Sequence, residues 1–216
     1  MTIHAYQEIY LSNAQSMLGD TFDYAMNACN MEGKDFVNLF LVSSISRRIE
    51  RGEAAILAGK SGAEIVHEII YETKGEKIPY THYERLDRSI EYWIGWAIAY
   101  YQWYTDRQYR EIFKIVSYHD LEKMYFPIHE ADITKFVDLM DAKIGETFPD
   151  TNLKRIRQLY NCTQAELASL AGVSLRSIQM YEQRNKNINK ASAETLYRLS
   201  KVLGCNIEDL LEKNMM

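Results

Sequence analysis

Residues that break helices are scarce in this chain, and their scarcity limits the folds open to it. Its 216 residues include only three prolines and ten glycines. Proline removes a backbone donor and glycine adds backbone freedom, so both interrupt helices. Apolar residues recur at helical spacing, for example at Ile133, Phe136 and Met140, and this period is typical of one buried helix face. The sequence therefore predicts an all-α protein.

Charge divides the chain near the stretch GETFPDT, residues 145–151. Residues 1–150 carry 15 Lys or Arg and 24 Asp or Glu, a net charge of −9, whereas residues 151–216 carry 10 and 6, a net charge of +4. A phosphate backbone repels the first part and attracts the second. We therefore predict two domains with different partners, an acidic one of six or seven helices at residues 1–146 and a small basic one at residues 147–216.

Local signals mark where helices of the first domain begin. Ser61 and Glu64 have the spacing of a capping box, and so do Thr105 and Gln108. Residues 72–87 combine glycine, proline and polar side chains, which predicts the longest loop.

The cysteines and the N-terminal sequence indicate the cellular compartment in which the protein is expected. Cys29, Cys162 and Cys205 are far apart and form no CxxC pair. This pattern predicts reduced thiols in a cytoplasmic protein and not a disulfide framework or a zinc site. The first ten residues lack the basic start and apolar run of a signal peptide.

All three tryptophans lie in the stretch EYWIGWAIAYYQWYTDRQY, residues 91–109. Its apolar part, residues 92–104, is too short for a bilayer, which needs about twenty residues, so no membrane partner is expected. A helix that is apolar nearly all round is a buried one, with Gly95 and Ala99 leaving a shallow row for a neighbouring helix. The alternative is a groove for a partner or a ligand lined by Trp93, Trp96, Tyr100 and Trp103.

Residues 152–212 are predicted to form five short helices. Thr163 and Glu166 have the spacing of a capping box. Gly172 permits a tight turn, and Ser174 caps the helix that follows. Two short helices joined by a turn that contains glycine form a helix-turn-helix. The core-facing residues of the second helix are Ile178 and Tyr181.

This stretch resembles the Cro/phage-repressor (XRE-type) helix-turn-helix family. The segments that carry the resemblance are TQAELASLAGVS, SIQMYE, ETLYRLSKVLG and IEDLL, in that order. The resemblance covers less than a third of the chain and implies a five-helix, lambda-repressor-like domain that binds double-stranded DNA as a homodimer on a pseudo-palindromic operator. The N-terminal region resembles little-characterised all-helical regions that precede such domains.

The resemblance also implies roles for individual residues. Gln164 matches a glutamine that touches phosphate at the start of a helix. Arg176 is the best candidate for reading a guanine, and Leu175 for contacting a thymine methyl. The residues that fall where the recognition helix meets the major groove are Ser174, Leu175, Arg176, Gln179 and Met180.

Two further features follow from the same resemblance. Arg157 and Glu182 match a structural ion pair, so we leave both off the list of DNA contacts. The loop QRNKNINK, residues 183–190, lacks the usual glycine and proline and is longer than is typical. Its cations are expected to position the protein on the DNA backbone without selecting sequence, and they are Arg184, Lys186 and Lys190.

The sequence offers no catalytic or metal-binding signature. AGKSG at residues 58–62 contains the end of a phosphate-binding loop, but that motif needs a glycine where Ala54 stands. The His-Glu pairs at 67–68 and 129–130 do not continue to a second histidine at helical spacing. We therefore predict no enzyme activity, no metal and no cofactor.

Together these features predict a sequence-specific transcriptional regulator, an autoregulatory repressor that reads the major groove with the helix at residues 174–183. The N-terminal domain is expected to supply dimerisation or to bind a protein partner or a small-molecule effector. The alternative is an antitoxin-type protein, in which the acidic domain neutralises a protein partner and the helix-turn-helix autoregulates the operon.

Overall fold

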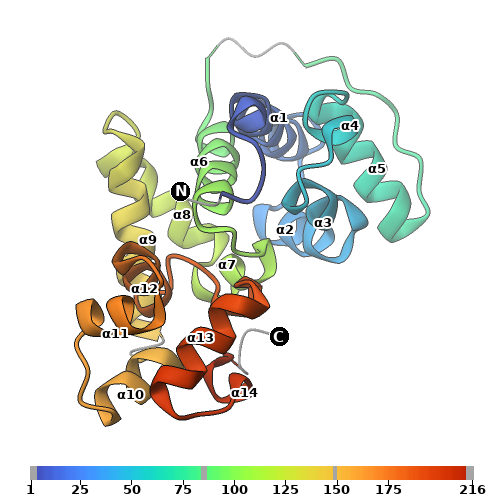
Figure 1. Cartoon of the computed structure of the whole chain (residues 1–216). Helices are drawn as coiled ribbons and strands as arrows, with labels where there is room; N and C mark the ends of the chain where they lie inside the picture. The colour runs from blue at the N-terminus through green and yellow to red at the C-terminus, as the bar shows by residue number, and fades with distance from the viewer. Residues whose placement is uncertain (1–3, 84–86, 148–149, 213–216) are drawn as a thin grey trace. The chain divides into compact units, whose positions relative to one another are not determined.

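The computed structural model is all-α, as the sequence predicts, and describes residues 4–83, 87–147 and 150–212 (Figure 1). No β-strand occurs in these ranges. The chain divides into two compact units, Met1–Asp138 and Leu139–Met216. Within the described ranges, every helix is too short or too polar to cross a membrane.

The first unit consists of helices joined by short turns. Single extended residues, such as Ser43, divide the chain into more helices than the six or seven that the apolar period predicts. A short 3-10 turn, η1 (Glu8–Tyr10), precedes α1, and a π-helical turn, η2 (Tyr24–Ala28), continues it. The helices are α1 (Leu11–Asp23), α2 (Gly33–Val42), α3 (Ser44–Glu50), α4 (Ala54–Leu57), α5 (Gly62–Lys74), α6 (Ile90–Thr105), α7 (Tyr109–Ile115), α8 (Tyr118–Ile128) and the start of α9 (Ile133–Thr147).

Helices α1 and α6 form the centre of this unit and make its most extensive helix–helix contact. The two backbones come very close at Gly95, where an added Cβ atom would lie 2.4 Å from the carbonyl oxygen of Leu18. At Gly19, an added Cβ would lie 2.8 Å from the ring of Tyr92. The predicted close approach at Gly95 is therefore confirmed, and it fixes which face of α6 is buried.

The aromatic stretch forms α6, but it is not buried all round. Tyr92 and Gly95 meet α1 and are buried, and Ile94, Ala97 and Ile98 are buried as well. The rings on another face are only half-buried, and they belong to Trp93, Trp96, Tyr100 and Tyr104. The interpretation of α6 as a core helix thus holds for most of its circumference, and the half-buried rings form the remaining stripe.

One predicted helix start is confirmed and another is wrong. Ser61 and Glu64 form the capping box at the start of α5, with the Ser61 amide donating to the Glu64 carboxylate at 2.8 Å. Thr105 instead ends α6, and Asp106 follows in the left-handed region with φ of 55°. The next helix is capped by Gln108, so the predicted start lies three residues early.

An arginine lies in the core of the first unit. Arg107 is 0% exposed and is the largest fully buried side chain of the described residues. None of its three guanidinium nitrogens has a hydrogen-bond partner there. Because an unpaired buried charge is costly, we expect this residue to destabilise the first unit.

The second unit contains the five short helices expected from the sequence. Its core is built from residues between 153 and 210, so the core of this unit is self-contained. Helix α9 crosses the division between the units, which falls before the predicted boundary at residues 146 and 147. The helices are α10 (Asn152–Leu159), α11 (Gln164–Ala171), α12 (Leu175–Glu182), α13 (Ala193–Leu203) and α14 (Ile207–Leu210), with a 3-10 turn, η3 (Ile188–Lys190), before α13.

Candidate nucleic-acid interface

Hydrogen bonds at both helix starts fix the turn between α11 and α12. At the start of α11, the Thr163 hydroxyl accepts from the Glu166 amide at 3.2 Å, and the Glu166 carboxylate accepts from the Thr163 amide at 2.8 Å. The bonds from Thr163 lower the pKa of Glu166. Gly172 ends α11 in the left-handed region with φ of 61°. These contacts produce the predicted helix-turn-helix.

The first turn of α12 presents its side chains to solvent. Ser174 caps the helix by accepting a hydrogen bond from the Ser177 amide at 3.1 Å. Leu175 is 40% exposed, Arg176 is exposed and Gln179 is half-buried. On the opposite side, the residues buried in the domain core are Ile178 and Tyr181. The start of α12 therefore has the open surface that a recognition helix needs.

A buried ion pair holds the far end of α12. Arg157 donates from Nε and Nη2 to the two carboxylate oxygens of Glu182, at 2.6 and 2.8 Å, and from Nη1 to the carbonyl of Cys162 at 2.6 Å. The two charged side chains are 11% and 2% exposed. Donating to the Glu182 carboxylate raises the pKa of Arg157. The structure thus contains the ion pair that the resemblance implies.

Gln164 joins this ion pair, a contact that the sequence did not predict. Its side-chain amide donates to Glu182 at 2.8 Å, across the turn from α11 to α12. The amide group of Gln164 therefore sits at the start of α11 with a fixed orientation. Its expected contact with phosphate stays a prediction.

Two residues expected to contact DNA are buried in the structure. Arg184 is 5% exposed, and its guanidinium donates to the Glu212 carboxylate and to the Asp150 carbonyl, both at 2.9 Å. Met180 is 9% exposed. We correct the sequence-based set accordingly, because neither side chain presents the surface that a phosphate or a base would contact.

The long loop after α12 folds back into its own domain. Arg184 follows the YE pair by two residues and adopts the left-handed region with φ of 59°. Ile188 is buried in the domain core. Lys186 lies with its ammonium 5.5 Å from the ring centroid of Tyr181, and Lys190 is exposed. Of the three predicted cations, only Lys186 and Lys190 keep surface for a DNA backbone.

Glu212 is a structural residue that the sequence did not single out. Besides pairing with Arg184, its carboxylate accepts from the backbone amide of Asn152 at 2.7 Å. Glu212 lies beyond the motif and far from Arg184 in the sequence, so no local spacing signals the contact.

The structure separates the four aromatic residues expected to line a groove. Trp93 and Trp96 line a cavity of the first unit. Trp103 is buried, and its indole nitrogen donates to the Tyr6 carbonyl at 2.9 Å. Tyr100 stacks on Tyr104 with a centroid distance of 6.0 Å. A groove lined by some of these rings stays a prediction.

Comparison with known proteins agrees with this geometry. The described part of the second unit is a helix-turn-helix module with an exposed recognition helix, which is the architecture of a DNA-binding domain. Residues 153–210 match the helix-turn-helix family model, and this region is of the XRE type. The match covers this module alone, and it supports a DNA-binding regulator of that type. No curated protein and no solved structure gave a match.

The same match informs the expectation of no enzyme activity. The matched domain is a DNA-binding regulatory domain and not an enzyme family. Among the described residues, no group of three or more His, Cys, Asp or Glu side chains is arranged to hold a metal ion.

Proposed function

We propose that this protein is an autoregulatory repressor that inserts α12 into the major groove of an operator beside its own gene. The observation that carries the proposal is the exposed first turn of α12, with Leu175 and Arg176 on its surface. Helix α12 is held at its start by the Ser174 cap and at its far end by the buried Arg157–Glu182 pair. A rigidly held helix start suits base recognition, because base contacts depend on geometry.

Different side chains in this module have different tasks in the proposal. Arg176 reads a guanine, because a guanidinium can donate to both of its major-groove acceptors. Leu175 contacts a thymine methyl, while Ser174 and Gln179 face the neighbouring base edges or phosphates. Gln164, Lys186 and Lys190 contact the backbone, which positions the protein and carries no sequence information.

We propose that the active form is a homodimer on a pseudo-palindromic operator. One module offers one recognition helix, which spans a single half-site, and helix-turn-helix proteins read two half-sites about one helical turn apart. The supporting charge pattern is a net +4 on residues 151–216 against −9 on residues 1–150, which favours contact with DNA through the module alone. We keep the domain boundary at residues 146 and 147, because the module's core starts at residue 153.

The test is footprinting of the protein on its own promoter, followed by competition with point-varied operators. Arg176→Ala should weaken binding by about 1–3 kcal/mol and relax the preference at one base pair. The matched control is Arg198→Ala on α13, where the arginine pairs with Glu194 on the helix surface. Equal losses of affinity on every operator for Arg176→Ala would refute the base-reading role.

A second function is favoured by the acidity of the first domain. We also consider an antitoxin-type protein whose −9 domain binds a basic protein partner, while the helix-turn-helix autoregulates the pair. Purification of the tagged chain from its native cell separates the two functions. A stoichiometric partner that is toxic when expressed alone supports the antitoxin, and a chain that is isolated alone and occupies its promoter supports the repressor.

A further inference from the structure

The first unit contains a small aromatic cavity that the DNA-binding function does not use. Its volume is about 270 Å³, slightly below the range of about 300–1,000 Å³ that is typical of drug-sized ligands. An occupant would therefore have one or two rings. The cavity lies between α6, the end of α8 and the start of α9, and its lining includes Arg88, Trp93, Tyr125, His129, Ala131 and Phe136.

The rings of this cavity hold one another in a fixed arrangement. Trp93 meets Tyr125 and Phe136 edge to face, with centroid distances of 5.6 and 5.5 Å. His129 stacks on Tyr125 at 4.3 Å, and its Nδ1 lies 3.1 Å from the Tyr125 carbonyl oxygen. Edge-to-face and stacked pairs are favourable geometries for aromatic rings. The wall is thus preformed for another flat, apolar ring.

The charge on the cavity wall is opposite to the charge of the surrounding domain. Residues 1–150 have a net charge of −9, yet none of the described residues that line the cavity is Asp or Glu. Arg88 is exposed, and its guanidinium lies 5.0 Å from the ring centroid of Tyr92. It forms no ion pair with any described residue. Its donors can therefore bind the carboxylate of a ligand whose ring enters the cavity.

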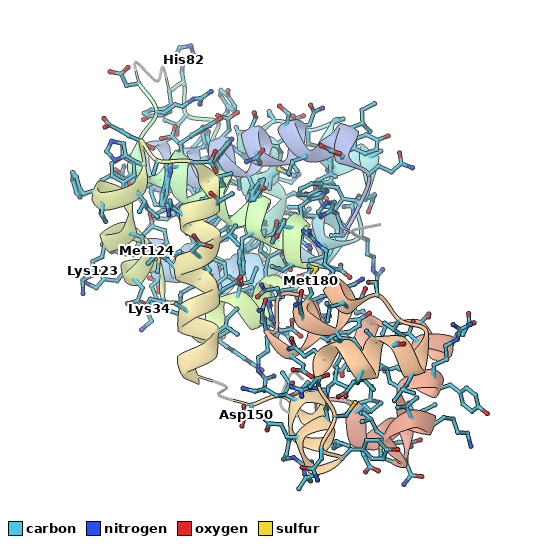
Figure 2. The ribbon with its side chains drawn as sticks, turned by 60° about the vertical axis from the view of Figure 1, so that its left-hand side comes forward. Lys34, His82, Lys123, Met124, Asp150 and Met180 are labelled. Carbon is cyan, nitrogen blue, oxygen red and sulfur yellow. The ribbon has the colours of Figure 1, made fainter. Side chains whose placement is uncertain are left out.

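The same cavity touches the helix that continues into the second unit. Ile133 and Phe136 belong to the first turns of α9, which runs unbroken to Thr147 (Figure 2). The division between the units falls inside this helix, after Asp138. A ligand packed on Phe136 therefore contacts the helix that leads into the second unit along the chain.

We propose that this cavity binds a small planar aromatic acid, with its carboxylate at Arg88, and that binding alters operator affinity through α9. The effector role rests on the proposed repressor function, whereas the binding itself does not. A cationic ligand is disfavoured by the guanidinium, and a neutral ring lacks the charge-assisted hydrogen bond.

Calorimetry on the full chain tests the ligand class with indole-3-acetate, neutral indole and cationic tryptamine. Indole-3-acetate should bind at least about tenfold more tightly than indole, since a hydrogen bond to a charged group is worth about one such factor, and tryptamine should bind most weakly. Arg88→Gln should remove the preference for the acid. The control Arg110→Gln changes an exposed arginine of α7 outside the cavity lining and should leave the preference intact.

A second variant tests the location without removing a packed ring. Ala131 is an exposed lining residue, and Ala131→Trp should fill the cavity and abolish binding while thermal unfolding stays unchanged. Equal affinity for the acid and for indole, or binding that survives both Arg88→Gln and Ala131→Trp, would overturn the assignment.

Operator titrations then test the effector role. Saturating indole-3-acetate should change the operator Kd several-fold for the wild type and leave it unchanged for Ala131→Trp. If the acid binds by calorimetry but the Kd stays the same, the effector role is wrong. If the chain binds no operator with or without the acid, the repressor function fails while the calorimetric result on the cavity still stands.

Discussion

The two units treat buried arginines in opposite ways. In the second unit, Arg157 pairs with Glu182 and Arg184 pairs with Glu212. In the first unit, Arg107 is fully buried, and its guanidinium has no hydrogen-bond partner among the described residues. A buried charge is tolerated when it is paired and is costly when it is not. In the second unit the Arg157–Glu182 pair holds the end of the recognition helix, whereas we expect Arg107 to weaken the first unit.

Breaking the pair at Glu182 should have the largest effect. Glu182→Ala leaves Arg157 buried without its carboxylate and removes the acceptor of Gln164, so it should destabilise the second unit by about 3–5 kcal/mol and abolish operator binding. All three tryptophans lie on α6, so tryptophan fluorescence reports the unfolding of the first unit. Its transition should occur at the wild-type temperature, while circular dichroism should show an earlier loss of helix from the second unit.

The control for this experiment is Glu194→Ala, which removes the exposed partner of Arg198. An exposed ion pair contributes about 0–1 kcal/mol, so this variant should melt nearly as the wild type does. If both variants lose the same stability, burial does not explain the contribution of the Arg157–Glu182 pair to the stability of the second unit.

Removing the buried cation of the first unit should raise stability instead of lowering it. Arg107→Met replaces the guanidinium with an apolar side chain, and we expect the first unit to gain about 1–4 kcal/mol in its free energy of unfolding. Chemical denaturation followed by tryptophan fluorescence measures this gain. Arg184→Met, applied to a paired arginine, should instead lower stability. A loss for Arg107→Met would mean that the guanidinium stabilises the core.

Disturbing the contact between α1 and α6 should loosen only the first unit. Gly95→Ala places a Cβ atom 2.4 Å from the Leu18 carbonyl oxygen, so α1 has to shift, at a cost of about 1–3 kcal/mol. The fluorescence-detected melting temperature should fall, while the full-length variant still binds the operator below that transition. An unchanged melting temperature would show that the two helices separate easily at this point.

The smallest effect is expected at the loop cation Lys186. Lys186→Ala should weaken binding to all sequences alike and reduce the slope of log affinity against log salt by about one. Titrations at several salt concentrations measure the slope, with Lys201→Ala as the control on α13. A change in base preference would contradict a role confined to the backbone.

Features that depend on short sequence separations could be predicted from the sequence. The capping boxes at Ser61 and Thr163 each need only two residues three positions apart, and both are present. The inward side of α12 follows from helical spacing, with Ile178 and Tyr181 in the core. Gly95 indicated a close contact between helices, and the structure has no room for a Cβ atom at this position.

Features that depend on distant partners could not be predicted. The burial of Arg184 relies on Glu212 and on the Asp150 carbonyl, and no motif connects these positions. The half-exposed rings of Trp93 and Trp96 reflect which face of α6 packs on α1. The aromatic cavity arises only when α8 and α9 fold against α6, so its lining residues have no common sequence signal.

The contacts of Glu212 also bring the two ends of the DNA-binding module together. Its carboxylate binds the Asn152 amide, and its partner Arg184 binds the Asp150 carbonyl. Domains with adjacent ends tolerate circular permutation. A short peptide could therefore join the ends, and the chain could be reopened at the exposed Asn161 turn between α10 and α11. We therefore expect a circularly permuted module, with its helices in a different order along the chain, to fold to the same structure.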